Sequence, residues 1–159
     1  MGIRYFALSI DEQDFDHISK GRCPSCGEEP TLRELGSEDD TRDSLDLDKS
    51  WHYLQFVLRS DPPRPAAALV AGDVTTTYWG WRPHRGLLNP AQVAAIAADS
   101  ATVSVELVRQ RILVDGRWGE EHSDRAQQDF EYVCDHLLRA QEFTKAVAGA
   151  GRAIRYYIG

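Results

Sequence analysis

Apolar residues recur at helical spacing within the first half of the chain, and this pattern predicts a helix over residues 48–59. The stripe that would face the core consists of Leu47, Trp51, Leu54 and Leu58. Asp46 or Asp48 is expected to cap this helix. A carboxylate there accepts amide hydrogens that the first turn leaves unpaired, and it favours the positive end of the helix dipole.

Other stretches have the patterns of strands and of further helices. Runs of β-branched and aromatic residues predict strands near residues 3–8, 74–79 and 153–158. Apolar spacing and helix-start signals predict helices near residues 10–20, 90–99, 103–111 and 124–148. We therefore expect an α+β fold, in which helices pack a small mixed sheet, within one domain spanning residues 1–159.

Two helix starts depend on particular side chains. Ser9 and Glu12 match a capping box, in which each side chain accepts an amide hydrogen of the other residue. Asn89, Pro90 and Gln92 supply an N-cap, a proline at the first helical position and a glutamine at the third. Residues 21–45 are rich in glycine, proline and acids, and they are predicted to form a long connection.

The length and hydropathy of the chain limit the class of protein. A chain of 159 residues suits one domain that buries about 70% of its unfolded surface without disulfides. No apolar run reaches the roughly 20 residues of a membrane span, and the first residues lack the features of a signal peptide. These observations predict a cytoplasmic protein that does not interact with a membrane.

Acidic residues outnumber basic ones by 25 to 18, which gives a formal net charge of −7. This balance argues against a nucleic-acid-binding protein, because contacts to phosphates require a clustered positive field. Between Glu28 and Asp48 the chain has nine acidic residues and only two basic ones, Arg33 and Arg42. Such a run is typical of a solvated loop, and its functional alternative is a surface that attracts a basic protein partner.

The same connection contains Cys23 and Cys26, which are two residues apart, with Pro24 between them and Gly27 after them. This spacing is typical of a knuckle that directs two thiolates at a zinc ion. A structural zinc site needs four ligands, and the remaining candidates are Cys134, His17, His52 and His136. A reduced loop without metal and a redox pair are the alternatives.

Two clusters of side chains are candidates for binding. The first turn of the helix over residues 48–59 carries Asp48, Lys49, Trp51 and His52, unless Trp51 anchors the core and the others form a solvated rim. A later turn carries Tyr78, Trp81, Arg82 and Arg85, where aromatic faces and guanidinium groups suit a carboxylate, a phosphate or a protein hot spot. The alternative is that an aromatic ring packs inward and the arginines pair with surface acids.

The segment from Leu47 to His52, followed by a leucine-rich helix, resembles the signature of the YfbM-like family of bacterial proteins. The stretch from Pro83 to Leu87 is similar to the family's element before a proline-started helix, and there Arg85 matches the family arginine. The resemblance covers nearly the whole chain. It implies a compact α+β fold and no known reaction, and the segment from Cys23 to Glu29 departs from the family pattern.

Three functions remain open at this point. The first is a non-catalytic protein-binding domain that holds a basic partner with its acidic face and the turn from Trp79 to Arg85. One form of this function is an immunity-like role toward a basic toxin. The second is a small-molecule-binding protein or enzyme with a cleft between His52, Tyr78 and Arg85. The third is a zinc-stabilised structural module. The sequence lacks a phosphate-binding glycine loop, a His-Glu-x-x-His motif and a nucleophile elbow, which favours binding over catalysis.

Overall fold

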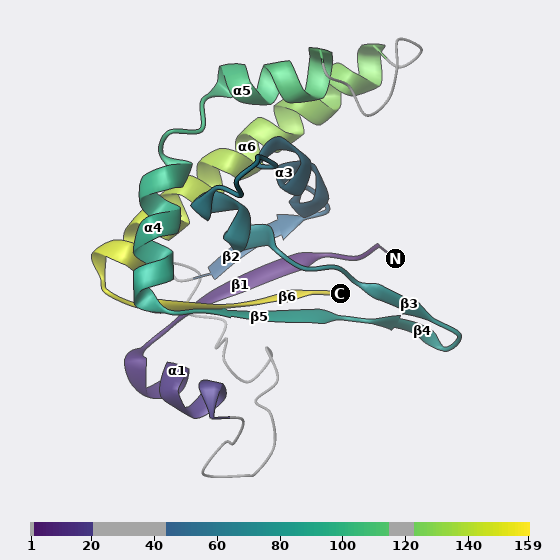
Figure 1. Cartoon of the computed structure of the whole chain (residues 1–159). Helices are drawn as coiled ribbons and strands as arrows, with labels where there is room; N and C mark the ends of the chain where they lie inside the picture. Colours follow the sequence, from purple (N-terminus) through teal and green to yellow (C-terminus); the bar gives the residue numbers. More distant parts are fainter. Residues whose placement is uncertain (1, 21–43, 115–122) are drawn as a thin grey trace.

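An antiparallel sheet organises the part of the chain that the computed structural model describes, residues 2–20, 44–114 and 123–159. Within these residues the sheet has four strands, in the order β2-β1-β6-β5 (Figure 1). Their bounds are Tyr5–Ile10 for β1, Ser44–Asp48 for β2, His84–Leu88 for β5 and Ala153–Ile158 for β6. The two chain ends meet at one end of this sheet, where Arg4 and Gly159 exchange backbone hydrogen bonds of 3.1 and 2.9 Å.

Alternate residues of the central strands point to opposite faces of the sheet, and one face forms the floor of the core. The rings of Tyr5 and Tyr156 stack on this face, with 5.5 Å between their centroids. Each hydroxyl donates a 2.8 Å hydrogen bond to a backbone carbonyl, Tyr5 to Leu69 and Tyr156 to Ala71. The core face therefore holds aromatic rings whose polar atoms are satisfied.

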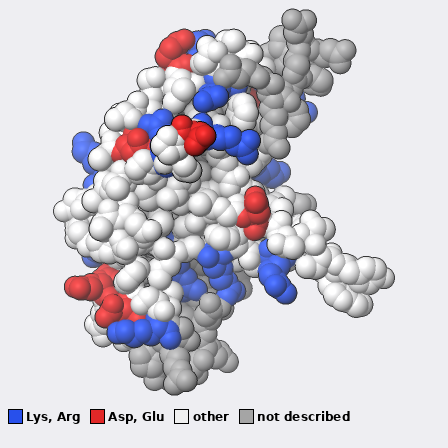
Figure 2. Space-filling view, viewed as in Figure 1, with Lys and Arg blue, Asp and Glu red and all other residues white. Residues whose placement is uncertain are grey.

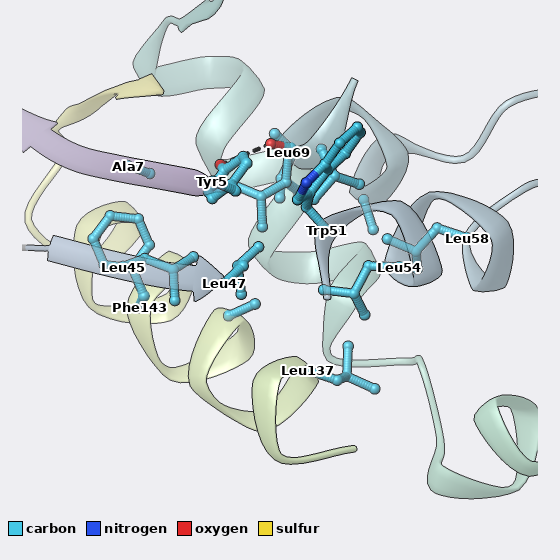
Figure 3. Close-up of a cluster of buried hydrophobic side chains, with 14 of the residues drawn as sticks. Tyr5, Ala7, Leu45, Leu47, Trp51, Leu54, Leu58, Leu69, Leu137 and Phe143 are labelled. Atoms are coloured by element: carbon cyan, nitrogen blue, oxygen red, sulfur yellow. Dashed lines mark hydrogen bonds between the residues drawn. The ribbon is translucent and has the colours of Figure 1, made fainter. Parts of the chain in front are cut away.

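Helices cover this core face. They are α3 (Trp51–Val57), the 3-10 helix η2 (Pro65–Val70), α4 (Pro90–Ser100) and α6 (Ser123–Gly149). The helix α5 (Val105–Arg109) and the π-helical segment η3 (Gln110–Val114) pack on α6, farther from the sheet (Figure 1). The short helix α1 (Glu12–Ser19) lies on the opposite side of the sheet (Figure 1). Figure 3 shows how Trp51 and Leu54 of α3 reach into the buried cluster beside Leu47 and Leu137.

The loop before η2 is held to the end of α4 by a two-point ion pair. Nε and Nη2 of Arg64 each lie 2.9 Å from a carboxylate oxygen of Asp99, and the backbone amide of Ala66 donates to the same carboxylate at 2.8 Å. The Arg64 guanidinium, the first of these partners, holds the pKa of Asp99 below its usual value, although partial burial raises it.

The expected α+β class is confirmed, and two features of the sheet differ from the expectation. The ladders are antiparallel throughout, so the sheet is not mixed. Residues 44–48 form β2 instead of the end of a connection and the start of a helix. Leu45 and Leu47 are buried and alternate with exposed residues, and the pairing of this segment with β1 makes it a strand.

The helices α1 and α3 are capped by other residues than predicted. Ser9 belongs to β1, where it pairs with Ile154, so the cap of α1 is Asp11, which accepts a 2.8 Å hydrogen bond from the amide of Asp14. The helix after β2 begins at Trp51, its N-cap is Ser50, and neither Asp46 nor Asp48 caps it. The capping box of Asn89 and Gln92 is confirmed.

The strand expected near residues 74–79 is part of a separate hairpin. Strands β3 (Thr75–Thr77) and β4 (Gly80–Arg82) pair with each other, and the hairpin projects beyond the main sheet (Figure 1). The expected helix at residues 103–111 starts at Val105, after an N-cap at Ser104, and changes to π geometry at Gln110.

None of the described helices is by itself long and apolar enough to cross a membrane. One pair, Pro90–Ser100 with Val105–Val114, passes that test of length and composition only when taken together across a bend of 81°.

Candidate functional site

The cluster predicted at the first turn of α3 is a structural junction. Asp48 ends β2 with a positive φ of 45°, and its carboxylate lies 2.8 Å from Nε of Arg4. Tyr132 of α6 donates its hydroxyl hydrogen to Asp48 at 3.0 Å and accepts the backbone amide of Lys49 at 3.2 Å. Asp48 therefore joins the edge strand to the N-terminal segment and to α6.

The electrostatics of Asp48 fit this structural role. Partial burial raises its pKa, but the hydrogen bond from Tyr132 and the charge of Arg4 outweigh burial, so the pKa lies below its usual value. A carboxylate in this state is a poor general base near neutral pH.

Trp51 and His52, like Asp48, have structural surroundings. The Trp51 side chain is only 9% exposed and packs in the core (Figure 3). The imidazole of His52 lies 5.8 Å from the Trp51 ring and 4.2 Å from the Tyr53 ring, measured between centroids. Trp51 therefore anchors the core, as in the structural alternative to a binding site.

The aromatic turn is the tip of the β3–β4 hairpin, which we call the arm (residues 75–82). Thr77 pairs with Gly80, so Tyr78 and Trp79 form a two-residue loop, and Gly80 takes the positive φ of 129° that glycine tolerates. Tyr78 and Trp79 are 91% and 92% exposed, and Trp81 is 48% exposed. Their placement contradicts the alternative in which an aromatic ring of this turn packs inward.

Trp79 is the most exposed aromatic residue of the arm. Its ring meets that of Tyr78 edge to face, with 5.0 Å between the centroids.

The structure does not bring His52, Tyr78 and Arg85 into one cleft. Tyr78 lies at the solvent-exposed tip of the arm, whereas His52 lies on α3 beside the core. Arg85 is on β5, opposite Tyr157 of β6, so it faces away from the core side of the sheet. Arg82 is on β4 and is exposed. The predicted residues therefore lie in three separate places: the junction at Asp48, the arm, and the face of the sheet that points away from the core.

The residue after Arg85 has to be a glycine, Gly86, because it packs against a ring of the neighbouring strand. A Cβ atom at this position would collide with the ring of Tyr156 across the ladder, so only glycine lets that ring lie flat over β5. The ring of His84, two residues before Gly86, also lies close to Tyr156, at 5.8 Å between centroids.

Cys23 and Cys26 lie outside the described residues, so the zinc site stays a prediction. Its four further candidate ligands are all among the described residues, and two of them, Cys134 and His136, have structural positions. Burial raises the pKa of the half-buried Cys134 thiol, and Nδ1 of the buried His136 lies 2.8 Å from the Tyr132 carbonyl oxygen. Among the described residues, no three His, Cys, Asp or Glu side chains are grouped as metal ligands.

Two hollows adjoin the edge strand β2. The larger, of about 480 Å³, lies between β2 and α6 and is lined by Ser44, Leu45, Asp46, Arg139, Glu142, Phe143 and Ala146. The smaller, of about 220 Å³, lies over β1 and β2 and is lined by Phe6, Ala7, Leu8, Ser44, Leu45 and Asp46. The sequence pattern pointed to neither hollow.

Comparison with known proteins identifies the family. Residues 1–157 match the model of a family described as "Domain of unknown function (DUF1877)". The chain belongs to the DUF1877 family. A solved structure of YfbM from Escherichia coli, itself described as a protein of unknown function, covers 99% of this chain and 100% of its own at a TM-score of 0.58. A search of curated proteins gave no match.

The DUF1877 assignment confirms the YfbM-like resemblance. The sequence identity with the Escherichia coli protein is 16%, so that likeness concerns the fold alone. The DUF1877 domain covers almost the whole chain and carries no assigned reaction, so function has to be argued from the residues themselves.

Proposed function

We propose that this DUF1877 protein is a non-catalytic binding protein that contacts a partner protein with its arm. The observation that carries the proposal is the exposure of Tyr78 and Trp79, 91% and 92%, at the tip of a projecting hairpin. In Figure 2 the arm extends from the body of the molecule, and its tip is drawn in the colour of uncharged residues.

The chemistry of the tip favours a protein interface. Tryptophan and tyrosine are the residues that most often carry the binding energy of protein interfaces, because each buries a large rigid surface at a small cost in side-chain entropy. The edge-to-face contact of Tyr78 and Trp79 arranges the two rings before binding. An exposed apolar surface at a hairpin tip lowers solubility. Such surfaces in proteins often mark interaction sites, which favours a binding role for the tip.

Charge indicates the kind of partner. The chain has a net charge of −7, and an acidic protein attracts a basic partner through long-range electrostatics. We infer a basic protein partner, and a protective role toward a basic toxin is one form of this function. The proposal is one of binding, since Arg4 and Tyr132 already engage the carboxylate of Asp48 at the end of β2.

The test is a quantitative capture experiment with the purified chain as bait. The double variant Tyr78→Ser, Trp79→Ser removes the aromatic tip, and Leu138→Ser, which removes another exposed apolar side chain at 53% exposure, is the matched control. We expect wild type and the control to enrich the same basic protein, and the double variant to bind it about 100-fold more weakly.

Salt dependence tests the electrostatic half of the proposal. The complex with the captured protein is expected to weaken as sodium chloride rises from 50 to about 500 mM, because screening shortens the reach of the net charge. Equal capture by wild type and the double variant would remove the arm from the interface. An acidic partner, or affinity that does not change with salt, would overturn the inferred basic partner.

A further inference from the structure

The strand β2 forms one edge of the four-stranded sheet, and the direction of its backbone groups follows from the ladder. Arg4 and Gly159 each donate an amide hydrogen to the other's carbonyl oxygen, so they are a hydrogen-bonded pair of β1 and β6. Such pairs alternate with non-hydrogen-bonded ones, so the amide and carbonyl of Ala7 on β1 point to β2. The partner of Ala7 there is Leu45. The amide and carbonyl of Asp46, the next residue, therefore point outward from the sheet.

Two hollows flank this edge, one on each face of the sheet. The hollow of about 480 Å³ lies between β2 and α6, and the hollow of about 220 Å³ lies over β1 and β2 on the face away from the core. Asp46 is exposed, and it lines both hollows together with Leu45. Because side chains of a strand point alternately to opposite faces, a strand added about 4.8 Å from β2 would direct successive side chains into the two hollows. This arrangement is typical of proteins that bind an extended peptide as an added strand.

The larger hollow combines an apolar floor with carboxylates. Leu45 and Phe143 are buried and form the floor (Figure 3). Glu142 follows this floor along α6 and is exposed. Asp46 adds a second carboxylate, which accepts the amide hydrogen of Asp48 at 2.7 Å. A lysine or arginine side chain matches this lining, because its aliphatic stem covers apolar surface while its charged end reaches a carboxylate.

Charge distinguishes two occupants of this edge, a basic peptide and a second copy of the chain. Arg139 is the basic residue among the described residues of the larger hollow, and its Nη2 lies 2.8 Å from a carboxylate oxygen of Asp135 on the same helix. The lining therefore stays negative toward a ligand. Two β2 edges paired around Asp46 would set two carboxylates opposite each other, and like charges in that position destabilise a sheet. A basic peptide is the better match.

We propose that β2 binds an extended basic peptide, a segment of a partner protein, as an added strand of the sheet. Asp46 exchanges backbone hydrogen bonds with the peptide, and a lysine or arginine side chain of the peptide lies over Phe143 with its charged end at Glu142. The site shares no residue with the arm, which projects away from β2 and α6 (Figure 1), so either proposal can fail without the other.

The first test measures binding of fluorescein-labelled nonapeptides to the full chain by fluorescence anisotropy at one ionic strength. In one peptide threonine and lysine alternate, and in the other glutamate replaces lysine. We expect the lysine peptide to bind at least about tenfold more tightly. Glu142→Gln is expected to weaken it about fivefold. Glu131→Gln, which removes a charge from the same helix outside the hollow, is expected to change its affinity less than about twofold.

The second test separates strand addition from charge attraction. Asp46→Pro and Asp46→Ala both remove the carboxylate, but only proline also removes the outward amide hydrogen, and edge strands tolerate proline. Asp46→Pro is expected to weaken the lysine peptide at least about fivefold more than Asp46→Ala does. If Asp46→Pro does not fold, Ala146→Trp carries the test. It fills the larger hollow from an exposed position, and it is expected to weaken the peptide at least about tenfold.

Several results would overturn the proposal. They are no binding of the lysine peptide to wild type, equal binding of the lysine and glutamate peptides, equal losses in Glu142→Gln and Glu131→Gln, and equal losses in Asp46→Pro and Asp46→Ala. A dimer in analytical ultracentrifugation that Asp46→Pro makes monomeric would also overturn it, because the edge then belongs to a second copy of the chain.

Discussion

Two groups of aromatic residues in this DUF1877 domain have opposite environments. In the core, Tyr5 and Tyr156 are almost fully buried, stacked on each other, and hydrogen-bonded to backbone carbonyls. At the tip of the arm, Tyr78 and Trp79 also contact each other, but both are more than nine-tenths exposed. The first pair stabilises the fold, and the second leaves its apolar surface available to another molecule.

This difference shows that aromatic content does not by itself indicate function. The core pair is flanked by glycine and by neighbouring strands that accommodate its rings, as Gly86 does for Tyr156. The arm pair follows a run of threonines on a hairpin whose residues are exposed on both strands. A two-stranded hairpin is marginally stable alone, so the arm depends on its continuation into β5 for its shape.

The largest effect is expected from breaking the core pair. Tyr156→Ala removes a buried ring from the centre of the sheet and leaves a cavity beside Tyr5. We expect the free energy of unfolding to fall by about 3–5 kcal/mol, the usual range for deleting a buried aromatic side chain. Urea unfolding followed by circular dichroism measures it. A loss below about 1 kcal/mol would mean that the stacked pair does not support the sheet.

Alkaline pH should weaken the same pair without a substitution. Burial raises the pKa of Tyr156 from 10.0 to about 12. Between these two values the folded state keeps a proton that the unfolded state releases, so stability is complete below pH 10 and falls as pH rises toward 12. The contribution of Tyr156 to this loss is about 2–3 kcal/mol, since one pKa unit corresponds to 1.36 kcal/mol.

Tyr156→Phe is the control for this pH dependence, because phenylalanine keeps the ring and does not ionise. The variant should lose less stability than wild type between pH 10 and 12 when both are unfolded in urea at each pH. Identical losses in the two proteins would show that ionisation of Tyr156 is not coupled to unfolding.

The sequence predicted the long elements well, because their signals are local. The spacing of Phe130, Val133 and Leu137 defines the core face of α6, and Asn89 with Gln92 caps α4. The strand β2 was missed because Leu47 fits both a period of two with Leu45 and a helical spacing with Trp51. Only pairing with β1, a non-local interaction, decides between the two.

The candidate sites were harder to predict for a related reason. Exposure of Trp79 and burial of Arg155 depend on which strands flank each residue, and the sequence does not state strand order. The alternation of Ile154, Tyr156 and Ile158 predicted the strand β6. The same alternation places Arg155 on the opposite face, which would be exposed to solvent if only the core side of the sheet were covered. The central position of β6, between β1 and β5, is what the sequence could not supply.

The smallest effect on stability is expected at the arm, and it tests the other half of the comparison. Trp79 is 92% exposed, so Trp79→Ala removes little surface that folding buries, and the free energy of unfolding should change by less than about 0.5 kcal/mol. Urea unfolding of this variant beside Trp51→Ala, which truncates a buried indole, provides the measurement and its contrast. A loss above about 1 kcal/mol in Trp79→Ala would mean that the arm packs against the body in solution, because only contacts made within the folded chain can raise its stability.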